Sequence, residues 1–236
     1  MAEPMRIQRA LARAGVLSRR KAEELVASGR VTVNGTTARV GQTVDPEHDV
    51  ILVDGTRVGA PAPAEWYLLH KPAGVITSRG DPEGRRTVFD LVPKRPGLTY
   101  VGRLDYLTEG VLLFTTDGTA AHRLTHPSRR VERTYVAFVL GDGEAAIEQA
   151  RHGVELDDGV VRPLRMRGEK TGRSRWQLTI TIAEGKNREV RRLCEALGLE
   201  VDRLVRVRFG PVELGDLAVG KVRSLTRAEV RALEAV

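Results

Sequence analysis

The stretch at residues 58–65, VGAPAPAE, limits the folds open to this chain most strongly, because it divides the sequence into two parts. Two prolines among small residues predict an extended linker. We therefore expect a small domain at residues 1–58, a linker at 59–64 and a larger domain at 65–236. A chain of 236 residues, 41% of them hydrophobic, is long enough for one large packed domain and a small module.

Simple features of the sequence exclude several classes of protein. No apolar run approaches the roughly 20 residues that cross a bilayer. The N-terminal residues lack the uninterrupted apolar segment of a signal peptide. The single cysteine, Cys194, rules out an intramolecular disulfide and a cysteine-based zinc site. We expect a soluble, cytoplasmic protein that does not bind a membrane.

The positive charge of the chain is concentrated near its N-terminus. The net charge is +7 and the pI is about 10.0. Residues 5–40 contain eight basic side chains against two acids, Glu23 and Glu24. The basic residues are Arg6, Arg9, Arg13, Arg19, Arg20, Lys21, Arg30 and Arg39. A basic face of this kind is typical of a protein that binds a polyphosphate.

The small domain is predicted to hold two helices followed by a hairpin. RIQRALARAG predicts a helix that stops at Gly15, and SRRKAEELVASG predicts a second helix from an N-cap at Ser18 to Gly29. VTVNGTTARV predicts two strands around an Asn34-Gly35 turn.

The first turn of the second helix carries an electrostatic conflict. Arg19, Arg20 and Lys21 lie where the helix dipole is already positive, so cations are unfavourable there. A phosphate would relieve the conflict, because it would meet the free N–H groups and the basic side chains together. A solvated basic turn explains the same residues equally well.

Roughly residues 5–55, which include RALARAGVLSRRKAEELVASGRVTVNG, are very similar to the S4 RNA-binding domain. In that family the two helices and the hairpin grip RNA by its shape and backbone. The resemblance implies that Arg6, Arg19, Arg20 and Lys21 contact RNA.

The larger domain is predicted to be an α+β domain. WYLLHKP, GVLLFTTDG, RTYVAFVLG and RWQLTITIAEG are typical of short strands, whereas NREVRRLCEALG and LTRAEVRALEAV are typical of helices. Thr226 and Glu229 are spaced as a capping box. The helix in NREVRRLCEALG should bury Val190, Leu193, Cys194 and Leu197. Strands joined mostly by hairpins, with helices at intervals, favour this class over a doubly wound sheet.

Asp105 is the candidate reactive group, because it lies in VGRLDYLTEG just before the apolar strand VLLFTT. The spacing alone fits a simple turn equally well. The longer segment, however, resembles the motif GRLDxxTxGxLLxTxDG of the pseudouridine synthases, in particular the RsuA/RluB-type ribosomal enzymes. That resemblance implies a mixed, mainly antiparallel sheet flanked by helices and makes Asp105 the essential catalytic residue.

Three further segments extend the resemblance over nearly the whole chain. LHKPAG resembles the family's NKPxG motif, with His70 where asparagine is more usual. RTY resembles a motif whose tyrosine, here Tyr135, packs against the target base. GKNREVRR resembles a motif whose basic residue pairs with the catalytic aspartate, and this implies Arg191. The other basic residues expected to contact RNA are Lys71, Arg103, Lys186, Arg188 and Arg192.

The implied chemistry suits these residue types. Pseudouridine formation breaks the N1–C1′ bond, turns the uracil and joins its C5 to C1′, so no cofactor is required. It needs a carboxylate as nucleophile or base at the sugar, and an aromatic ring can hold a base that has left its stack. His122 and His126 have a spacing that can bind zinc on a helix, but no third ligand is evident, so we expect no metal.

We therefore predict a pseudouridine synthase that acts as a monomer on ribosomal RNA, either free or in a ribosome assembly intermediate. The segments NREVRRLCEALG and RLTHPSRRVERTY resemble the large-subunit branch more than the small-subunit branch. One alternative is a non-catalytic binding protein that assists ribosomal RNA maturation. The intact set of Asp105, Tyr135 and Arg191 argues against it. Another is a synthase acting on small-subunit ribosomal RNA or transfer RNA.

Overall fold

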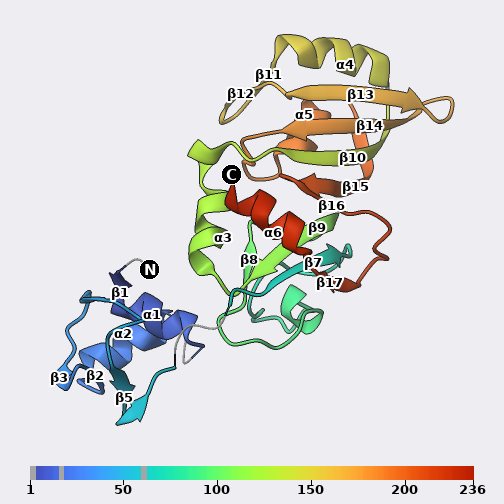
Figure 1. Cartoon of the computed structure of the whole chain (residues 1–236). Helices are drawn as coiled ribbons and strands as arrows, with labels where there is room; N and C mark the ends of the chain where they lie inside the picture. The colour runs from blue at the N-terminus through green and yellow to red at the C-terminus, as the bar shows by residue number, and fades with distance from the viewer. Residues whose placement is uncertain (1–3, 16–18, 60–62) are drawn as a thin grey trace. The chain divides into compact units, whose positions relative to one another are not determined.

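The computed structural model describes residues 4–15, 19–59 and 63–236, except for the side chain of Arg19. The chain forms two compact units (Figure 1). The first comprises Met1–Glu65, Lys94–Thr99 and Thr115–Thr119, and the second comprises Trp66–Pro93, Tyr100–Phe114 and Ala120–Val236. Within the described residues, no helix is long and apolar enough to span a membrane.

The first unit contains two helices and short strands, as predicted. The helices are α1 (Ile7–Arg13) and α2 (Arg19–Ala27). A four-stranded antiparallel sheet has the order β3 (Thr36–Thr37), β2 (Val31–Val33), β5 (Ile51–Val53) and β6 (Thr56–Arg57). A separate pair joins β1 (Met5–Arg6) to β4 (Thr43–Val44). The expected hairpin is confirmed, because Asn34 and Gly35 both have positive φ between the paired strands β2 and β3.

The spacing of apolar residues explains why the two helices of the first unit pack together. Ile7 and Leu11 face the core from α1, and Ala22 and Val26 face it from α2. Each pair is four residues apart, so both members lie on one side of their helix. The predicted helix end at Gly29 agrees with its left-handed backbone conformation. The predicted N-cap, Ser18, lies outside the described residues.

The second unit is built on a nine-stranded mixed sheet, which confirms the predicted fold class. The main order is β13 (Arg165–Lys170), β14 (Arg175–Ile182), β10 (Arg133–Leu140), β15 (Glu200–Phe209), β9 (Thr108–Thr115), β7 (Trp66–Lys71) and β17 (Val222–Ser224). Two short strands complete it: β16 (Val212–Glu213) pairs with β15, and β8 (Thr99–Val101) pairs with β9. The β9–β15 pair is parallel, whereas the neighbours of β10 are antiparallel to it.

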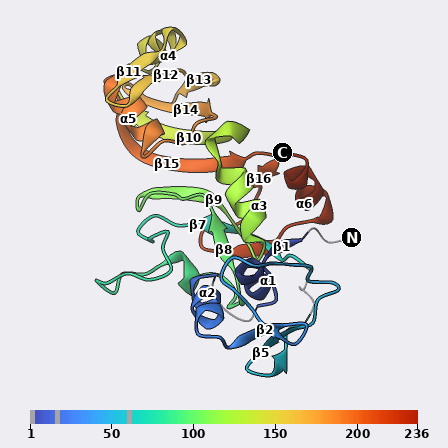
Figure 2. The ribbon, with the colours of Figure 1, turned by 90° about the vertical axis from the view of Figure 1, so that its left-hand side faces the viewer.

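Helices cover this sheet on both faces. In Figure 1, α5 (Glu189–Ala196) lies behind the sheet and α6 (Arg227–Glu234) lies in front of it. The other helices are α3 (Gly118–Thr125) and α4 (Gly143–His152), together with the 3-10 turns η1 (Val88–Asp90) and η2 (Pro127–Arg129). The hairpin of β11 (Val154–Leu156) and β12 (Gly159–Val161) lies close to α5. Figure 2 shows α4 at the β13 edge of the sheet.

The predicted apolar face of α5 and the capping box of α6 are confirmed. All four apolar residues expected on α5 or just after it are buried, and the side chains of Thr226 and Glu229 cap each other's backbone N–H groups at the start of α6. These two helices therefore begin and pack as the sequence pattern indicates.

Gly110 allows the parallel strands β9 and β15 to approach each other. It pairs with Arg206 and has a φ of +107°. A Cβ atom at this position would lie 2.1 Å from the Arg206 carbonyl oxygen and 2.7 Å from its backbone nitrogen. Both contacts are with backbone, which cannot rotate away. The glycine of the GRLDxxTxG pattern is therefore needed for the sheet beneath Asp105.

We expect Gly110→Ala to lower the free energy of unfolding by about 2–3 kcal/mol, because β15 must shift to accept a methyl group and a non-glycine residue is strained at this φ. Chemical denaturation monitored by circular dichroism measures the change. Gly118→Ala is the matched control, since a Cβ atom there would have no neighbour within 4 Å. Equal midpoints for the two variants would contradict the explanation.

Candidate active site

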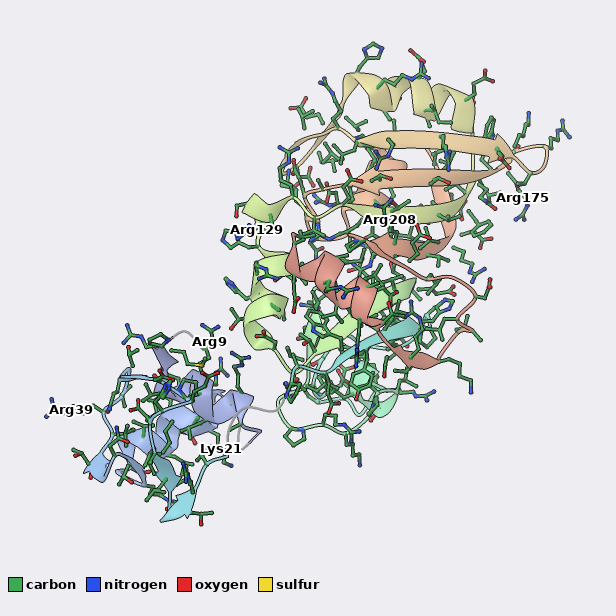
Figure 3. All side chains as sticks on the ribbon, in the orientation of Figure 1. Arg9, Lys21, Arg39, Arg129, Arg175 and Arg208 are labelled. Atoms are coloured by element: carbon green, nitrogen blue, oxygen red, sulfur yellow. The ribbon has the colours of Figure 1, made fainter. Side chains whose placement is uncertain are left out.

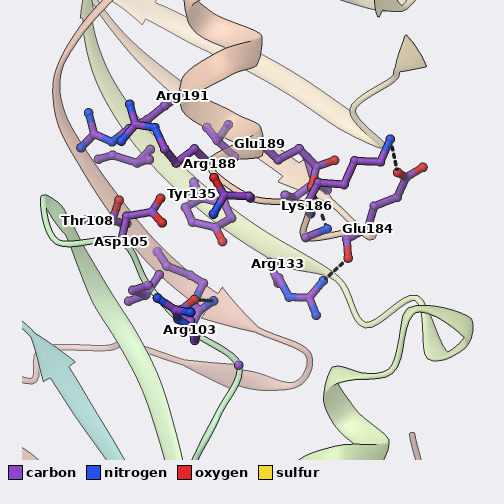
Figure 4. Close-up of a pocket in the computed structure, with 18 of the residues that line it drawn as sticks. Arg103, Asp105, Thr108, Arg133, Tyr135, Glu184, Lys186, Arg188, Glu189 and Arg191 are labelled. Carbon is purple, nitrogen blue, oxygen red and sulfur yellow. Dashed lines mark hydrogen bonds and ion pairs between the residues drawn. The ribbon is translucent and has the colours of Figure 1, made fainter. Parts of the chain in front are cut away.

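The predicted catalytic residues meet in one pocket of about 390 Å³ in the second unit. The loop at residues 102–105 forms one wall, and β10, α5 and β15 supply the others. Asp105, Tyr135 and Arg191 all line it, although the first and the last of them are 86 positions apart in the sequence. In Figure 4, Tyr135 lies between Asp105 and Arg133. The fold therefore gathers a carboxylate, a phenol and several cations around one cavity.

Lys71 fixes the backbone beside Asp105. Its Nζ donates to the carbonyl oxygens of Thr108 at 2.9 Å, Asp105 at 3.1 Å and Tyr106 at 3.3 Å. It also donates to the Pro72 carbonyl at 3.0 Å. We predicted that Lys71 contacts RNA, and this is wrong, because the side chain is completely buried and its donors are turned toward these carbonyls. Lys71 is instead an internal clamp for the Asp105 loop.

The burial of Lys71 has an electrostatic cost. The pKa of Lys71 is lowered from 10.5 to about 8, mainly by desolvation and to a smaller extent by Arg206, while the carboxylates of Asp105 and Glu109 oppose the shift. The ammonium group is still mostly protonated at neutral pH. It therefore adds positive charge directly beneath Asp105.

Arg191 lies close to Asp105 but does not pair with it directly. Both residues are described by the structure, and no ion pair within 4.0 Å joins their side chains. Arg191 Nη2 instead donates to the Leu107 carbonyl at 3.0 Å, two residues after Asp105. Burial lowers the pKa of the Arg191 guanidinium, Arg188 lowers it further, and Asp105 raises it. The expected pairing is thus replaced by a contact with the loop backbone and a charge interaction at longer range.

Tyr135 and Arg133 project from β10 onto the same face of the sheet, because side chains alternate along a strand. Both are buried and both line the pocket. Arg133 Nη1 donates to the carbonyls of Ala183 and Glu184, at 3.2 Å each, and its guanidinium lies 5.3 Å from the Phe209 ring centroid. Burial lowers the pKa of Arg133, while Tyr135 raises it.

Arg206 on β15 is a further buried cation at this pocket. Its Nε donates to the Val111 carbonyl at 2.8 Å, and its Nη1 donates to the Arg103 carbonyl at 3.4 Å. Its Nη2 is buried and has no partner among the described residues. Arg206 therefore links β9 to the backbone of the Gly102–Asp105 segment.

The turn before α5 brings other predicted RNA contacts to the pocket. Glu189 accepts from the backbone nitrogens of Gly185 at 2.6 Å and Lys186 at 2.8 Å, which fixes the turn. Burial raises the pKa of Glu189. Lys186, exposed Arg188 and exposed Arg103 all line the cavity.

The predicted RNA contact of Arg192 is not supported by its position. Its guanidinium pairs with Asp158 at 2.8 Å, and it is not among the residues that line the pocket. Its Nε also donates to the Asn187 carbonyl at 2.9 Å. The side chain is therefore held against the β11–β12 turn, because residue 192 lies on a different side of α5 from residue 191.

Four buried cations lie at the pocket or next to it: Arg133, Arg191 and Arg206 line it, and Lys71 contacts the backbone of the Asp105 loop. Among the described residues, none of them forms an ion pair with a carboxylate, and all four donate to backbone carbonyls instead. Carbonyl dipoles do not cancel a full charge. The site is therefore suited to a carboxylate of its own and to an anionic substrate.

The predicted RNA contacts of the first unit lie at or near the surface. Arg6 is exposed and donates to the Gly41 carbonyl, and Arg20 and Lys21 are exposed in the first turn of α2. Figure 3 labels Lys21 on this helix. The side chain of Arg19 lies outside the described residues.

The sequence prediction gave no role in the site to Arg133 or Arg206. Arg133 belongs to the RTY motif, and its position two residues before Tyr135 on a strand puts both side chains on one face. Arg206 gave no such signal, because its place depends on the parallel pairing of β15 with β9. His70 is buried, and its Nδ1 bonds with the Leu217 carbonyl at 2.6 Å.

The chain is similar to known proteins in both of its parts. A family described as RNA pseudouridylate synthase matches residues 65–196, and the S4 domain family matches residues 5–51. A relative from Pseudomonas aeruginosa, named ribosomal large subunit pseudouridine synthase B, is 45% identical over 95% of this chain and 60% of its own length. Relatives with the same name from Vibrio vulnificus and Escherichia coli K12 are 46% and 44% identical over 89% of this chain. The chain covers 68% and 75% of their lengths.

A solved structure described as a crystal structure of pseudouridylate synthase is 27% identical and has a TM-score of 0.65. The similarity covers 97% of this chain and 99% of that one.

Proposed function

The chain belongs to the RNA pseudouridylate synthase family and carries an S4 domain, and from this we propose that it converts uridine to pseudouridine in large-subunit ribosomal RNA. The observation that carries the proposal is the joint placement of Asp105, Tyr135 and Arg191 around one basic pocket. The names of the relatives support large-subunit RNA as the substrate.

The reaction is a rearrangement in which the atoms of the nucleotide are conserved. The N1–C1′ bond breaks, a C5–C1′ bond forms, C5 loses its proton and N1 gains one. We assign Asp105 to the sugar, either as the nucleophile that attacks C1′ or as the base that removes a sugar proton. Tyr135 packs against the uracil after it leaves its stack. Arg191 holds the loop that carries Asp105 through the Leu107 carbonyl.

The proposed division of labour assigns binding to residues 1–58 and chemistry to residues 65–236, with residues 59–64 as the linker. Residues Arg6, Arg19, Arg20 and Lys21 would bind RNA backbone in the first part, and Arg103, Lys186 and Arg188 would do so near the pocket. The protein would act as a cytoplasmic monomer on ribosomal RNA or on an assembly intermediate. No step of the reaction assigns a role to a cofactor.

We expect Arg20→Glu plus Lys21→Glu to weaken RNA binding by about tenfold or more at moderate salt, because two phosphate contacts are lost and two repulsions are added. The slope of log affinity against log salt should fall by about 2. Filter binding at several salt concentrations measures both quantities. Arg39→Glu plus Arg57→Glu changes the charge equally on exposed positions of the same module. Equal losses in the two double variants would show that only net charge matters.

The function is tested by release of tritium from transcripts labelled at C5 of uridine, because that hydrogen leaves when C5 bonds to C1′. Unmodified large-subunit RNA, small-subunit RNA and transfer RNA are compared. We expect release from the large-subunit transcript above the other two. Release only from another RNA would change the substrate, and tight binding without release from any RNA would support a non-catalytic maturation factor.

A further inference from the structure

Two large apolar side chains are exposed directly after Asp105. Tyr106 is 48% exposed and Leu107 is 56% exposed, and neither is among the residues that line the pocket. They occupy the two variable positions of the pattern GRLDxxT. The sequence motif therefore assigns them no role, although they form the rim next to the reactive carboxylate.

The backbone under these side chains is held from several directions. The Tyr106 carbonyl accepts from the Gly74 nitrogen at 2.8 Å and from Lys71 Nζ at 3.3 Å. The Leu107 carbonyl accepts from Arg191 Nη2 at 3.0 Å. The flanking carbonyls of Asp105 and Thr108 also accept from Lys71. These bonds fix the loop backbone, and with it the positions from which the two exposed side chains project.

The surroundings of this rim favour RNA as its partner. Arg103 and Arg188 are exposed at the adjoining pocket. Arg85 also lies near Tyr106, but its guanidinium is paired with Asp81 at 2.8 Å. An apolar rim with cations near it is complementary to a nucleic acid, which offers phosphates around the flat faces of its bases.

The proposed reaction requires the target uridine to leave its stack, and exposed apolar side chains can assist this step. A uridine that enters the pocket leaves a gap in its stack, and unstacking costs a few kcal/mol. Apolar side chains that insert between bases offset this cost in other complexes. A rigid rim is suited to this task because no loop entropy is lost on binding.

We propose that Tyr106 and Leu107 form a wedge that enters the stack vacated by the target uridine, with Tyr106 against a neighbouring base. The inference rests on the proposed function and goes beyond it by naming residues that extract the nucleotide from structured RNA. Tyr106 and Leu107 are positioning residues, since they do not touch the reacting atoms. They allow the enzyme to modify substrates in which the uridine is stacked.

The test compares two RNAs that contain the uridine modified by the wild-type protein. One is a hairpin in which the uridine is stacked, and the other is the same strand without its complementary arm. We expect Tyr106→Ala and Leu107→Ala each to lower kcat/KM on the hairpin by about 10- to 100-fold, in line with the loss of one stacking contact. On the unpaired strand we expect less than about a threefold change.

Conservative variants and a fluorescent base distinguish the loss of the wedge from a general loss of the folded structure. Tyr106→Phe and Leu107→Met should retain activity on both RNAs, as should Leu164→Ala, which removes an exposed leucine elsewhere. A 2-aminopurine in place of the target uridine should brighten with the wild type as it leaves the stack, and should stay quenched with Tyr106→Ala plus Leu107→Ala.

Losses that are equal on the two RNAs, or activity within twofold of wild type on the hairpin, would overturn the wedge. A wild-type protein that modifies neither RNA nor the full ribosomal transcript would instead overturn the proposed function, and the wedge with it.

Discussion

Asp105→Asn is expected to bind large-subunit RNA as the wild type does and to release tritium at least about 10³-fold more slowly, the scale of losing a group on which the chemical step depends. Asparagine has nearly the same shape but can neither attack C1′ nor accept a sugar proton. The loop should keep its position, because Lys71 and Arg191 hold backbone carbonyls of the loop and not the Asp105 side chain.

Asp216→Asn is the matched control for this result, since Asp216 is exposed and lies away from the pocket. It should keep full activity. Equal affinity of Asp105→Asn and wild type for RNA would show that the loss is chemical. Turnover by Asp105→Asn within tenfold of wild type would exclude Asp105 as the catalytic carboxylate.

Lys71→Met is expected to lower both stability and turnover while leaving RNA affinity nearly unchanged, because Lys71 is buried and its contacts are internal. The carbonyls of Pro72 and Thr108 would lose their Lys71 donor, which we expect to cost about 2–4 kcal/mol of unfolding free energy. Turnover should fall by about 10²-fold, since a displacement of the carboxylate by about 1 Å has an effect of this size.

Denaturation and single-turnover kinetics measure the two effects of Lys71→Met. Lys170→Met removes an exposed lysine at the end of β13 and should change neither. If Lys71 contacted RNA after all, Lys71→Met would weaken binding and leave turnover at saturating RNA intact.

Lys71 should also make the free energy of unfolding depend on pH. Because the pKa of Lys71 is about 8 in the folded protein and 10.5 is its ordinary value, the unfolded chain binds more protons between these two values. The contribution of Lys71 to stability therefore rises with pH across that window. The difference in unfolding free energy between wild type and Lys71→Met should widen by up to roughly 3 kcal/mol from pH 8 to 10.5. Parallel curves would show that the pKa of Lys71 is not lowered.

The elements that could be predicted from the sequence are those with local patterns. The Asn34-Gly35 turn, the apolar face of α5 and the Thr226 capping box depend on residues within a few positions of one another. The mixed sheet followed from the family resemblance, because no local pattern shows that β9 and β15 pair in parallel.

The site was predictable at the level of its motifs and less so at the level of contacts. The motifs identified the pocket residues Asp105, Tyr135 and Arg191, but not that Arg191 would bind the Leu107 carbonyl. Lys71 was expected to contact RNA, but the structure buries its side chain completely. Its burial depends on carbonyls that converge from two loops, and this convergence appears only in three dimensions.

The most direct test of the account is a map of pseudouridine in an unmodified large-subunit ribosomal RNA transcript after incubation with the protein. Carbodiimide treatment followed by reverse transcription marks each pseudouridine as a stop. We predict stops at discrete uridines with the wild type and none with Asp105→Asn. A wild-type protein that binds the transcript and produces no stop would contradict the account.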